Sequence, residues 1–224
     1  MKAATSFVGI FIILSGFLGN INPLSGQITI HLDNPSFEDT PRAGTPYTPA
    51  IKGWDDCGHF QFPAETPPDI HGEKSNAWSV ALKPYDGETY LGLVVRYNGS
   101  YESVSQKLGK PMKKDSCYSF SAFMARSEAY KSATRRSNYA LVSFISPAVL
   151  RIWGGNEACE QKELIGQSHP VENSGWKHYR FVLRPKENHT YITIEAYYAN
   201  LTPVAYNGHI LIDNLSPIVE IECK

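Results

Sequence analysis

Side chains that could bind a polar ligand share one face of two predicted strands. Glu195 and Tyr197 alternate with apolar residues in the run 191–198, so they point to the same side of a strand. Arg151 and Trp153 alternate in the same way with a leucine and an isoleucine. Aromatic rings beside arginine and glutamate suit sugars, because C–H faces stack on rings while hydroxyl groups make directional hydrogen bonds. The pattern therefore predicts a glycan-binding face.

Three further side chains are candidates for the same ligand, namely Trp78, Arg96 and Arg126. In this hypothesis the aromatic rings stack on a sugar and the arginines donate to its hydroxyl groups or to the carboxylate of an acidic sugar. Glu195 accepts from hydroxyl groups or orients Arg151. The alternative is structural, because an Arg–Glu pair with stacked aromatic residues often only stabilises neighbouring strands.

Short β-strands must position these side chains. No segment keeps a 3.6-residue apolar period over three turns without a breaker, which argues against long helices. Clusters of Gly, Pro, Asn and Asp separate apolar or alternating runs, and this pattern predicts an all-β sandwich of two sheets. The predicted strands are 28–32, 90–96, 102–108, 117–126, 149–153, 176–183, 191–198 and 209–214.

Charge and the N-terminal segment limit the class of protein. The chain has 22 acidic and 21 basic residues, so it lacks the basic surplus that nucleic-acid binders use. Residues 1–26 carry Lys2 as their only charge before an apolar block, which predicts a secretory signal peptide. The block is too short for a transmembrane segment, and a membrane-tethering N-terminal helix is the alternative. We expect a secreted protein, extracellular, on the cell surface or periplasmic, with residues 27–224 as a single domain.

The four cysteines indicate two disulfides. They form no Cys-x-x-Cys or Cys-His cluster, so an exported protein with disulfides is favoured over a zinc site. Four cysteines allow three pairings. If the strand that begins at Cys117 and the strand that precedes Cys159 lie antiparallel, these two cysteines meet. This interpretation favours Cys117–Cys159 and leaves Cys57 to pair with Cys223.

Motifs at both ends of the predicted domain match a known architecture. The segment 34–39 reads Asn-Pro-Ser-Phe-Glu-Asp, and the segment 210–214 reads Ile-Leu-Ile-Asp-Asn. With these and with the motifs at 150–155 and 195–198, the sequence resembles the galactose-binding-domain-like jelly roll of many carbohydrate-binding modules. The closer likeness is to secreted Bacteroidota proteins. The resemblance covers 33–223 and implies a jelly-roll β-sandwich of two antiparallel sheets.

The resemblance also implies a metal. In related carbohydrate-binding modules a structural calcium often lies where the two ends of the domain meet. By resemblance, Glu38 and Asp213 are the positions that could supply the oxygen ligands that calcium prefers. The alternative is that Asp213 and Asn214 only cap a turn while Glu38 pairs with a lysine.

The motifs favour binding over catalysis. Hydrolysis of a glycosidic bond requires two carboxylates, and Glu195 has no second carboxylate beside it on its strand. The histidines lack the spacing of a catalytic metal site, and no Gly-x-Ser-x-Gly elbow occurs. We therefore expect a non-catalytic carbohydrate-binding module with a glycan or polysaccharide as its partner. The alternative is a structural or adhesive surface protein that contacts another protein.

Overall fold

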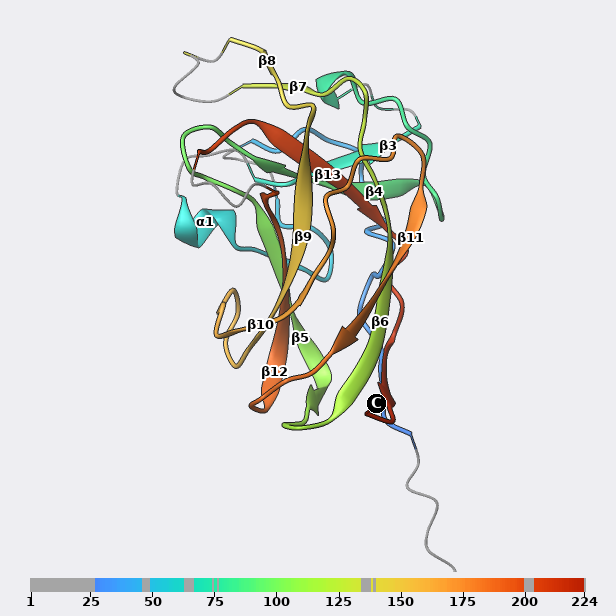
Figure 1. Ribbon diagram of the computed structural model, residues 1–224. Coiled ribbons are helices and arrows are strands. Elements are labelled where there is room, and N and C mark those ends of the chain that lie inside the picture. Colours follow the sequence, from blue (N-terminus) through green and yellow to red (C-terminus); the bar gives the residue numbers. More distant parts are fainter. Residues whose placement is uncertain are drawn as a thin grey trace, which may run out of the picture.

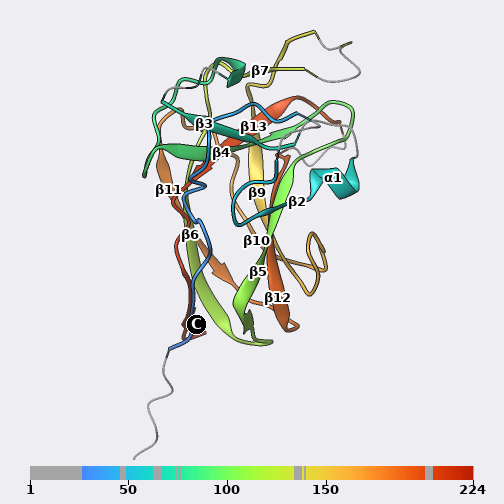
Figure 2. The ribbon, with the colours of Figure 1, turned by 180° about the vertical axis from the view of Figure 1, so that it is seen from behind.

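The computed structural model consists of two β-layers packed face to face (Figures 1 and 2). This architecture confirms the predicted all-β jelly-roll sandwich. No described helix is long and apolar enough to cross a membrane. The predicted signal peptide lies outside the described residues, which are 27–45, 49–62, 67–73, 75, 77–133, 138, 140–199 and 204–223.

The first layer is built around β6, which pairs with β11 along one edge and with β13 and β14 along the other. β13 continues to β4 and β3, and β14 continues to β1. All of these pairings are antiparallel. The strands of this layer are β1 (Thr29–Ile30), β3 (Asp69–Gly72), β4 (Thr89–Val95), β6 (Cys117–Ala125), β11 (Lys177–Leu183), β13 (Gly208–Asp213) and β14 (Ile218–Ile221).

The second layer has the antiparallel order β10-β9-β12-β5-β2. The two layers join at one corner, where β13 runs parallel to the start of β9. A hairpin of β7 (Lys131–Ser132) and β8 (Val142–Ser143), the helix α1 (Gly58–Gln61) and the 3-10 turn η1 (Ala77–Ser79) lie in the connections. The strands of the second layer are β2 (Asp55–Asp56), β5 (Ser103–Met112), β9 (Ser146–Gly155), β10 (Glu163–Gln167) and β12 (His189–Tyr198).

Alternate residues of the strands fill the core between the layers. Leu150 and Ile152 of β9 and Ile192 and Ile194 of β12 are fully buried there. Burying each such side chain contributes about 1.5–3 kcal/mol. Because successive residues of a strand point to opposite faces, the residues between them must face away from the core. The outer face of the second layer therefore carries the polar and aromatic partners of these strands.

The cysteines form two disulfides, as predicted, but their pairing differs from the predicted one. Cys57 is bonded to Cys159, and Cys117 is bonded to Cys223. The prediction assumed that β6 and β9 are neighbours, whereas they lie in different layers. Cys117 instead lies opposite Ile221 of β14, two residues before Cys223. Strand pairing across the sandwich thus overturns the predicted Cys117–Cys159 bond.

Candidate functional site

The outer face of the second layer brings together the side chains predicted for one ligand-binding face. Glu195 of β12 lies opposite Arg151 of β9 on one side and opposite Ser103 of β5 on the other. One step along, Trp153 lies opposite a threonine of β12. Tyr197 follows Glu195 on the same face. We call Ser103, Arg151, Trp153, Glu195 and Tyr197 the Glu195 cluster.

Arg151 lies flat on an aromatic ring and reaches toward the carboxylate. Its guanidinium carbon is 3.4 Å from the ring centroid of Tyr197, a cation–π contact. Its Nε donates to Gln167 Oε1 at 3.0 Å. Its Nη1 is 3.8 Å from Glu195 Oε1, an ion-pair distance without a hydrogen bond. Since the side chain is still 24% exposed, part of the guanidinium faces solvent.

Glu195 is a buried carboxylate with one free oxygen. Its side chain is 1% exposed. Gln161 donates its amide N–H to Oε2, whereas Oε1 has no hydrogen-bond partner among the described residues. Burial raises the pKa of Glu195 to about 7, although Trp153, Arg151 and Gln161 oppose this rise. This carboxyl group can therefore hold or release a proton near neutral pH.

Buried polar atoms without partners gather around this carboxylate. Ser103 Oγ makes no hydrogen bond to any described residue, whereas the indole N–H of Trp153 interacts with the Glu195 carboxylate closely enough to lower its pKa, without the geometry of a full hydrogen bond. An unsatisfied buried polar group costs about 1–3 kcal/mol.

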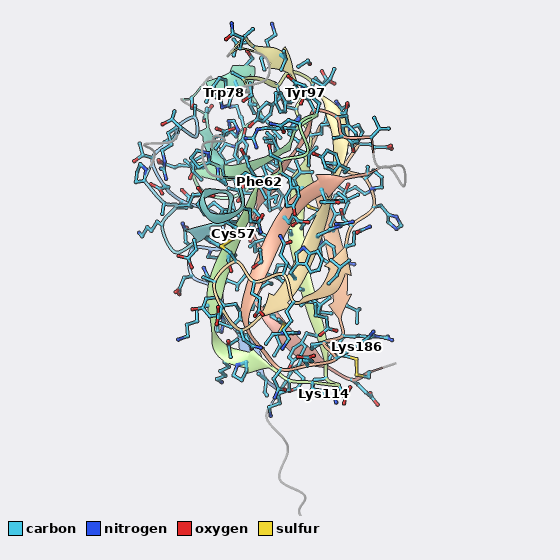
Figure 3. All side chains as sticks on the ribbon, turned by 90° about the vertical axis from the view of Figure 1, so that its left-hand side faces the viewer. Cys57, Phe62, Trp78, Tyr97, Lys114 and Lys186 are labelled. Atoms are coloured by element: carbon cyan, nitrogen blue, oxygen red, sulfur yellow. A yellow bond between two sulfur atoms is a disulfide. The ribbon has the colours of Figure 1, made fainter. Side chains whose placement is uncertain are left out.

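The Cys57–Cys159 disulfide lies against this face. The backbone N–H of Cys57 donates to the carbonyl of Ser103 at 3.0 Å, which fixes the start of α1 on β5. Cys159 belongs to the loop that carries Gln161 to Glu195. Figure 3 labels Cys57 and, near it, Phe62, the residue that follows α1. The disulfide thus joins two segments that both contribute to the site.

Aromatic rings border the cluster. Tyr101 packs edge-on against Tyr197 with ring centroids 5.3 Å apart, and Phe62 packs edge-on against Tyr101 at 5.0 Å. All three rings are half-buried. Sequence reasoning missed Tyr101 and Phe62, because neither alternates within a predicted strand. It also missed Gln161, whose loop carries no pattern that places it near Glu195.

Arg96 does not lie on this face, contrary to the prediction. Its side chain is fully buried and forms an ion pair with Glu102, whose side chain is 2% exposed. The second oxygen of Glu102 accepts the backbone N–H of Val94 at 3.0 Å. Arg96 therefore cannot reach a ligand from solution in this structure. An apolar strand that ends in arginine looks the same in sequence whether that arginine is exposed or paired inside.

Trp78 and Arg126 lie apart from the Glu195 cluster, which also differs from the prediction. The indole Nε1 of Trp78 donates to Asp69 at 2.8 Å, and Tyr130 donates its hydroxyl to the same carboxylate. Trp78 thus packs on a second apolar cluster, which includes Tyr130. Arg126 donates to the carbonyl oxygen of Ile145 at 3.0 Å. Both residues follow strands of the first layer, so the sandwich separates them from β12.

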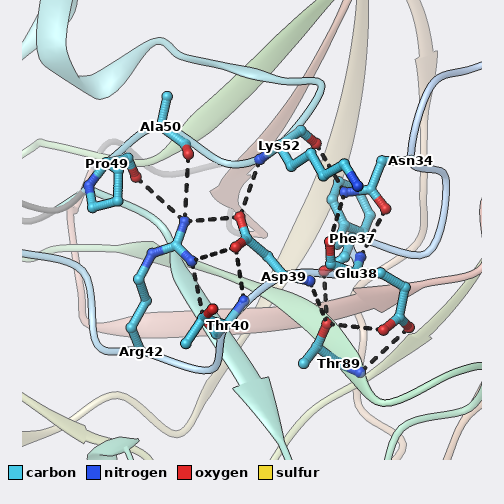
Figure 4. Close-up of polar contacts among 10 residues, drawn as sticks. All are labelled: Asn34, Phe37, Glu38, Asp39, Thr40, Arg42, Pro49, Ala50, Lys52 and Thr89. Atoms are coloured by element: carbon cyan, nitrogen blue, oxygen red, sulfur yellow. Dashed lines mark hydrogen bonds and ion pairs between the residues drawn. The ribbon is translucent and has the colours of Figure 1, made fainter.

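The carboxylates predicted to bind calcium accept hydrogen bonds from the loop before β4. Asp213 Oδ2 accepts the backbone N–H groups of Tyr85 and Asp86 at 2.8 and 3.0 Å. Glu38 Oε1 accepts the N–H of Glu88 at 2.9 Å, and its other oxygen contacts the Thr89 hydroxyl (Figure 4). Asp213 accepts backbone N–H groups, as the capping alternative expects, whereas the partners of Glu38 are N–H and O–H donors rather than the lysine of that alternative.

These donors do not make up a calcium ligand set. Calcium takes 6–8 oxygen ligands, whereas N–H groups point at the carboxylate oxygens of Asp213 and Glu38. Among the residues that the structure describes, no group of three or more His, Cys, Asp and Glu side chains is arranged to hold a metal ion. Calcium binding stays a prediction that no contact supports.

The Asp213→Ala protein is expected to be less stable by about 1–3 kcal/mol, with or without calcium. The change leaves the partly buried N–H groups of Tyr85, Asp86 and Asn214 without their acceptor. Thermal melts of both proteins in calcium and in chelator measure this effect. A parent melting temperature that rises with calcium, and a variant that loses this rise, would support the metal instead.

Comparisons with known proteins support the fold and leave the ligand open. The sequence matches no family model and no curated protein sequence. An apo cyclase from Fischerella sp. matches with a TM-score of 0.51 and 10% identity over 88% of this chain and 98% of the cyclase. The arabinose-bound α-L-arabinofuranosidase MgGH51 matches with a TM-score of 0.50 and 12% identity over 87% of this chain. This chain spans 27% of that enzyme.

A carbohydrate-binding domain is also among the similar structures. The CBM22-1 xylan-binding domain from Paenibacillus barcinonensis matches with a TM-score of 0.43 and 12% identity, over 82% of this chain and 95% of that domain. At these identities the two matches with TM-scores of 0.50 and 0.51 show a shared fold alone, and the match at 0.43 carries no argument. Function must therefore be argued from the residues of this chain. The Bacteroidota origin that the sequence resemblance implies stays a prediction.

Proposed function

We propose that this protein is a secreted, non-catalytic module that binds a glycan at the Glu195 cluster. The observation that carries the proposal is the partly exposed guanidinium of Arg151 beside a border of half-buried aromatic rings on one sheet face. Sugar hydroxyl groups accept hydrogen bonds, so they can bind the part of the Arg151 side chain that is exposed. The C–H faces of the same sugar can pack on the aromatic rings.

The contacts of Glu195 support binding rather than hydrolysis. Arg151, Trp153 and Gln161 interact with Glu195, and none of them is a carboxylic acid. Glycoside hydrolysis requires a second carboxylate on the other side of the scissile bond. Two disulfides support export to an oxidising compartment, where free glycans and polysaccharides occur.

A second candidate function is contact with another protein through the outer face of the first layer. Tyr85 stacks on Phe123 with ring centroids 3.5 Å apart, and Phe123 stacks on His178 at 4.8 Å. Tyr85 is 46% exposed, and Val182 on the same layer is 53% exposed. Large exposed side chains that are held in place in this way are typical of interaction surfaces.

We expect Tyr197→Ala and Trp153→Ala to weaken glycan binding at least about tenfold, equivalent to about 1.4 kcal/mol. Tyr197 holds Arg151 through its cation–π contact, and Trp153 supplies a half-buried ring on the same face. The measurement is a glycan array followed by calorimetric titration with the best ligand. Because the apolar face of β9 and β12 holds the fold, melting temperatures should confirm that both variants are folded.

The matched control is Tyr85→Ala, which removes an exposed tyrosine from the other layer. It should bind the glycan like the parent. If the cluster variants bind normally and Tyr85→Ala does not, the site lies on the first layer. If no variant changes binding, the Glu195 cluster only stabilises the sheet.

A further inference from the structure

β11 is an edge strand of the first layer. Its residues all pair with β6, from Lys177 opposite Met124 to Leu183 opposite Tyr118, without a shift of register. Among the described residues no strand pairs with the other edge of β11. In an antiparallel ladder alternate residues direct their N–H and C=O groups to the neighbouring strand, so the remaining backbone groups of β11 point away from β6.

This edge is held in place at both ends. Before β11, the backbone N–H of Arg126 donates to the carbonyl oxygen of Asn173 at 2.8 Å. After β11, the N–H of Asp115 donates to the carbonyl oxygen of Pro185 at 2.9 Å. Because the neighbouring segments fix the strand beyond its own pairing, the free backbone groups of β11 are already aligned for a further strand.

The outer face of β11 carries side chains that can select such a strand. His178, Arg180 and Val182 are exposed and alternate with residues of the core, which include Phe181 and Leu183. Val182 is 53% exposed, which is unusual for an aliphatic side chain. A strand that paired with β11 would place its own alternate side chains beside these three residues.

A row of stacked rings ends at this edge. Tyr85 stacks on Phe123 of β6, and Phe123 stacks on His178 of β11. His178 is the last ring of this row among the described residues. An aromatic side chain on an added strand would therefore extend the row beyond His178.

The charge of β11 indicates what kind of strand it accepts. The strand reads Lys-His-Tyr-Arg-Phe-Val-Leu and has no acidic residue. Lys177 and Arg180 are exposed, and neither has a carboxylate partner within the described part of the chain. Charged side chains on an edge discourage pairing with another copy. Full antiparallel overlap of two β11 strands would place Arg180 opposite Arg180, so a partner of opposite charge is favoured over a second copy.

We propose that β11 binds an extended acidic segment of another protein, which adds to the first layer as a further antiparallel strand. An acidic residue of this segment lies beside Arg180, an aromatic residue beside His178 and an aliphatic residue beside Val182. Backbone hydrogen bonds supply affinity and the alternate side chains supply specificity. This inference rests on the second candidate function, for which it names the partner, and it is independent of the glycan site.

The probe is the acetylated and amidated peptide Thr-Val-Thr-Glu-Thr-Tyr-Thr. In antiparallel register its valine lies opposite Val182, its glutamate opposite Arg180 and its tyrosine opposite His178. We expect it to bind with a Kd below about 1 mM. The same peptide with lysine in place of glutamate should bind at least about tenfold more weakly.

Two N-methylated forms of the peptide test strand addition itself. One carries methyl groups on the backbone nitrogens of valine, glutamate and tyrosine, and the other carries them on the nitrogens of the threonines between and after them. Only one of these sets faces β11 in an antiparallel ladder. One form should therefore lose binding while the other keeps it, with a difference of at least about tenfold.

Charge reversal assigns the contact to β11. Arg180→Glu should weaken the glutamate peptide about tenfold and strengthen the lysine peptide about tenfold. Lys110→Glu makes the same change of charge at an exposed position of β5 in the other layer and should bind both peptides like the parent. Amide NMR spectra follow each titration and should show shifts of the β11 signals. If Arg180→Glu is unfolded by its melting curve, Arg180→Gln replaces it and should bind the two peptides equally.

The remaining outcomes overturn the proposal. The edge does not take such a segment if the parent binds no peptide with a Kd below about 1 mM. Equal binding of the two N-methylated forms excludes strand addition, and equal effects of Lys110→Glu and Arg180→Glu indicate general surface charge. If the β11 signals shift on dilution of a dimeric protein, the occupant is a second copy. Glycan titrations of the same variants show separately whether the Glu195 cluster binds its ligand.

Discussion

The Arg96→Ala protein is expected to be less stable than the parent by about 3–5 kcal/mol. Arg96 and Glu102 form an ion pair in which neither side chain is more than 2% exposed. Removal of the arginine leaves Glu102 as a buried carboxylate, with the N–H of Val94 as its remaining hydrogen-bond donor. Equilibrium unfolding in urea, followed by tryptophan fluorescence, measures the difference.

The controls for this prediction separate charge from packing. The double variant Arg96→Met with Glu102→Leu removes both charges and should lose less than the single variant, because no isolated charge stays buried. Arg180→Ala, an exposed arginine of β11, should stay within about 0.5 kcal/mol of the parent. If the Arg96→Ala protein loses less than about 1 kcal/mol of its free energy of unfolding, water reaches Glu102 in that variant.

Removal of the Cys117–Cys223 disulfide is expected to destabilise the fold by up to about 4.7 kcal/mol by the loop-closure model. The bond joins residues 106 apart in sequence and holds the end of the chain against β6. The Cys57–Cys159 bond joins residues 102 apart, so its loss should cost a similar amount. Unfolding of each Cys→Ser double variant without reductant measures these losses.

The two disulfide variants should differ in ligand binding. Loss of Cys57–Cys159 releases α1 and the loop that carries Gln161, so glycan binding should weaken about tenfold or more. Loss of Cys117–Cys223 should leave binding unchanged at temperatures where the protein is folded. Peptide mapping under non-reducing conditions checks the pairing itself, and a Cys117–Cys159 peptide would contradict the structure.

The fold class and the composition of the candidate site could be predicted from the sequence in large part. Glu195, Tyr197, Arg151 and Trp153 share a face because alternation within a strand is a property of the local backbone. Each predicted strand overlaps a strand of the structure. Segments such as β10 were missed, because five residues that include a glycine carry no strong alternation.

Residues outside β9 and β12 could not be placed by side-chain alternation. Arg96 and Arg126 both follow apolar runs, but Arg96 is fully buried beside Glu102 while Arg126 bonds a backbone carbonyl oxygen. Nothing in the local pattern distinguishes the two, because burial depends on which distant segment covers a strand end. Gln161 could not be found for a related reason. It lies in a loop, where no regular alternation of residues fixes the direction of a side chain.

The sequence by itself determined that the described chain is a β-sandwich, that its cysteines form disulfides and which side of β9 and β12 carries polar groups. Only the tertiary structure decided that β9 lies beside β12, that Cys57 meets Cys159 and that Glu195 is buried beneath Gln161. The first group depends on side-chain alternation and composition, which act within a few residues. The second depends on strand pairing between segments dozens of residues apart, where packing of the whole core selects one arrangement.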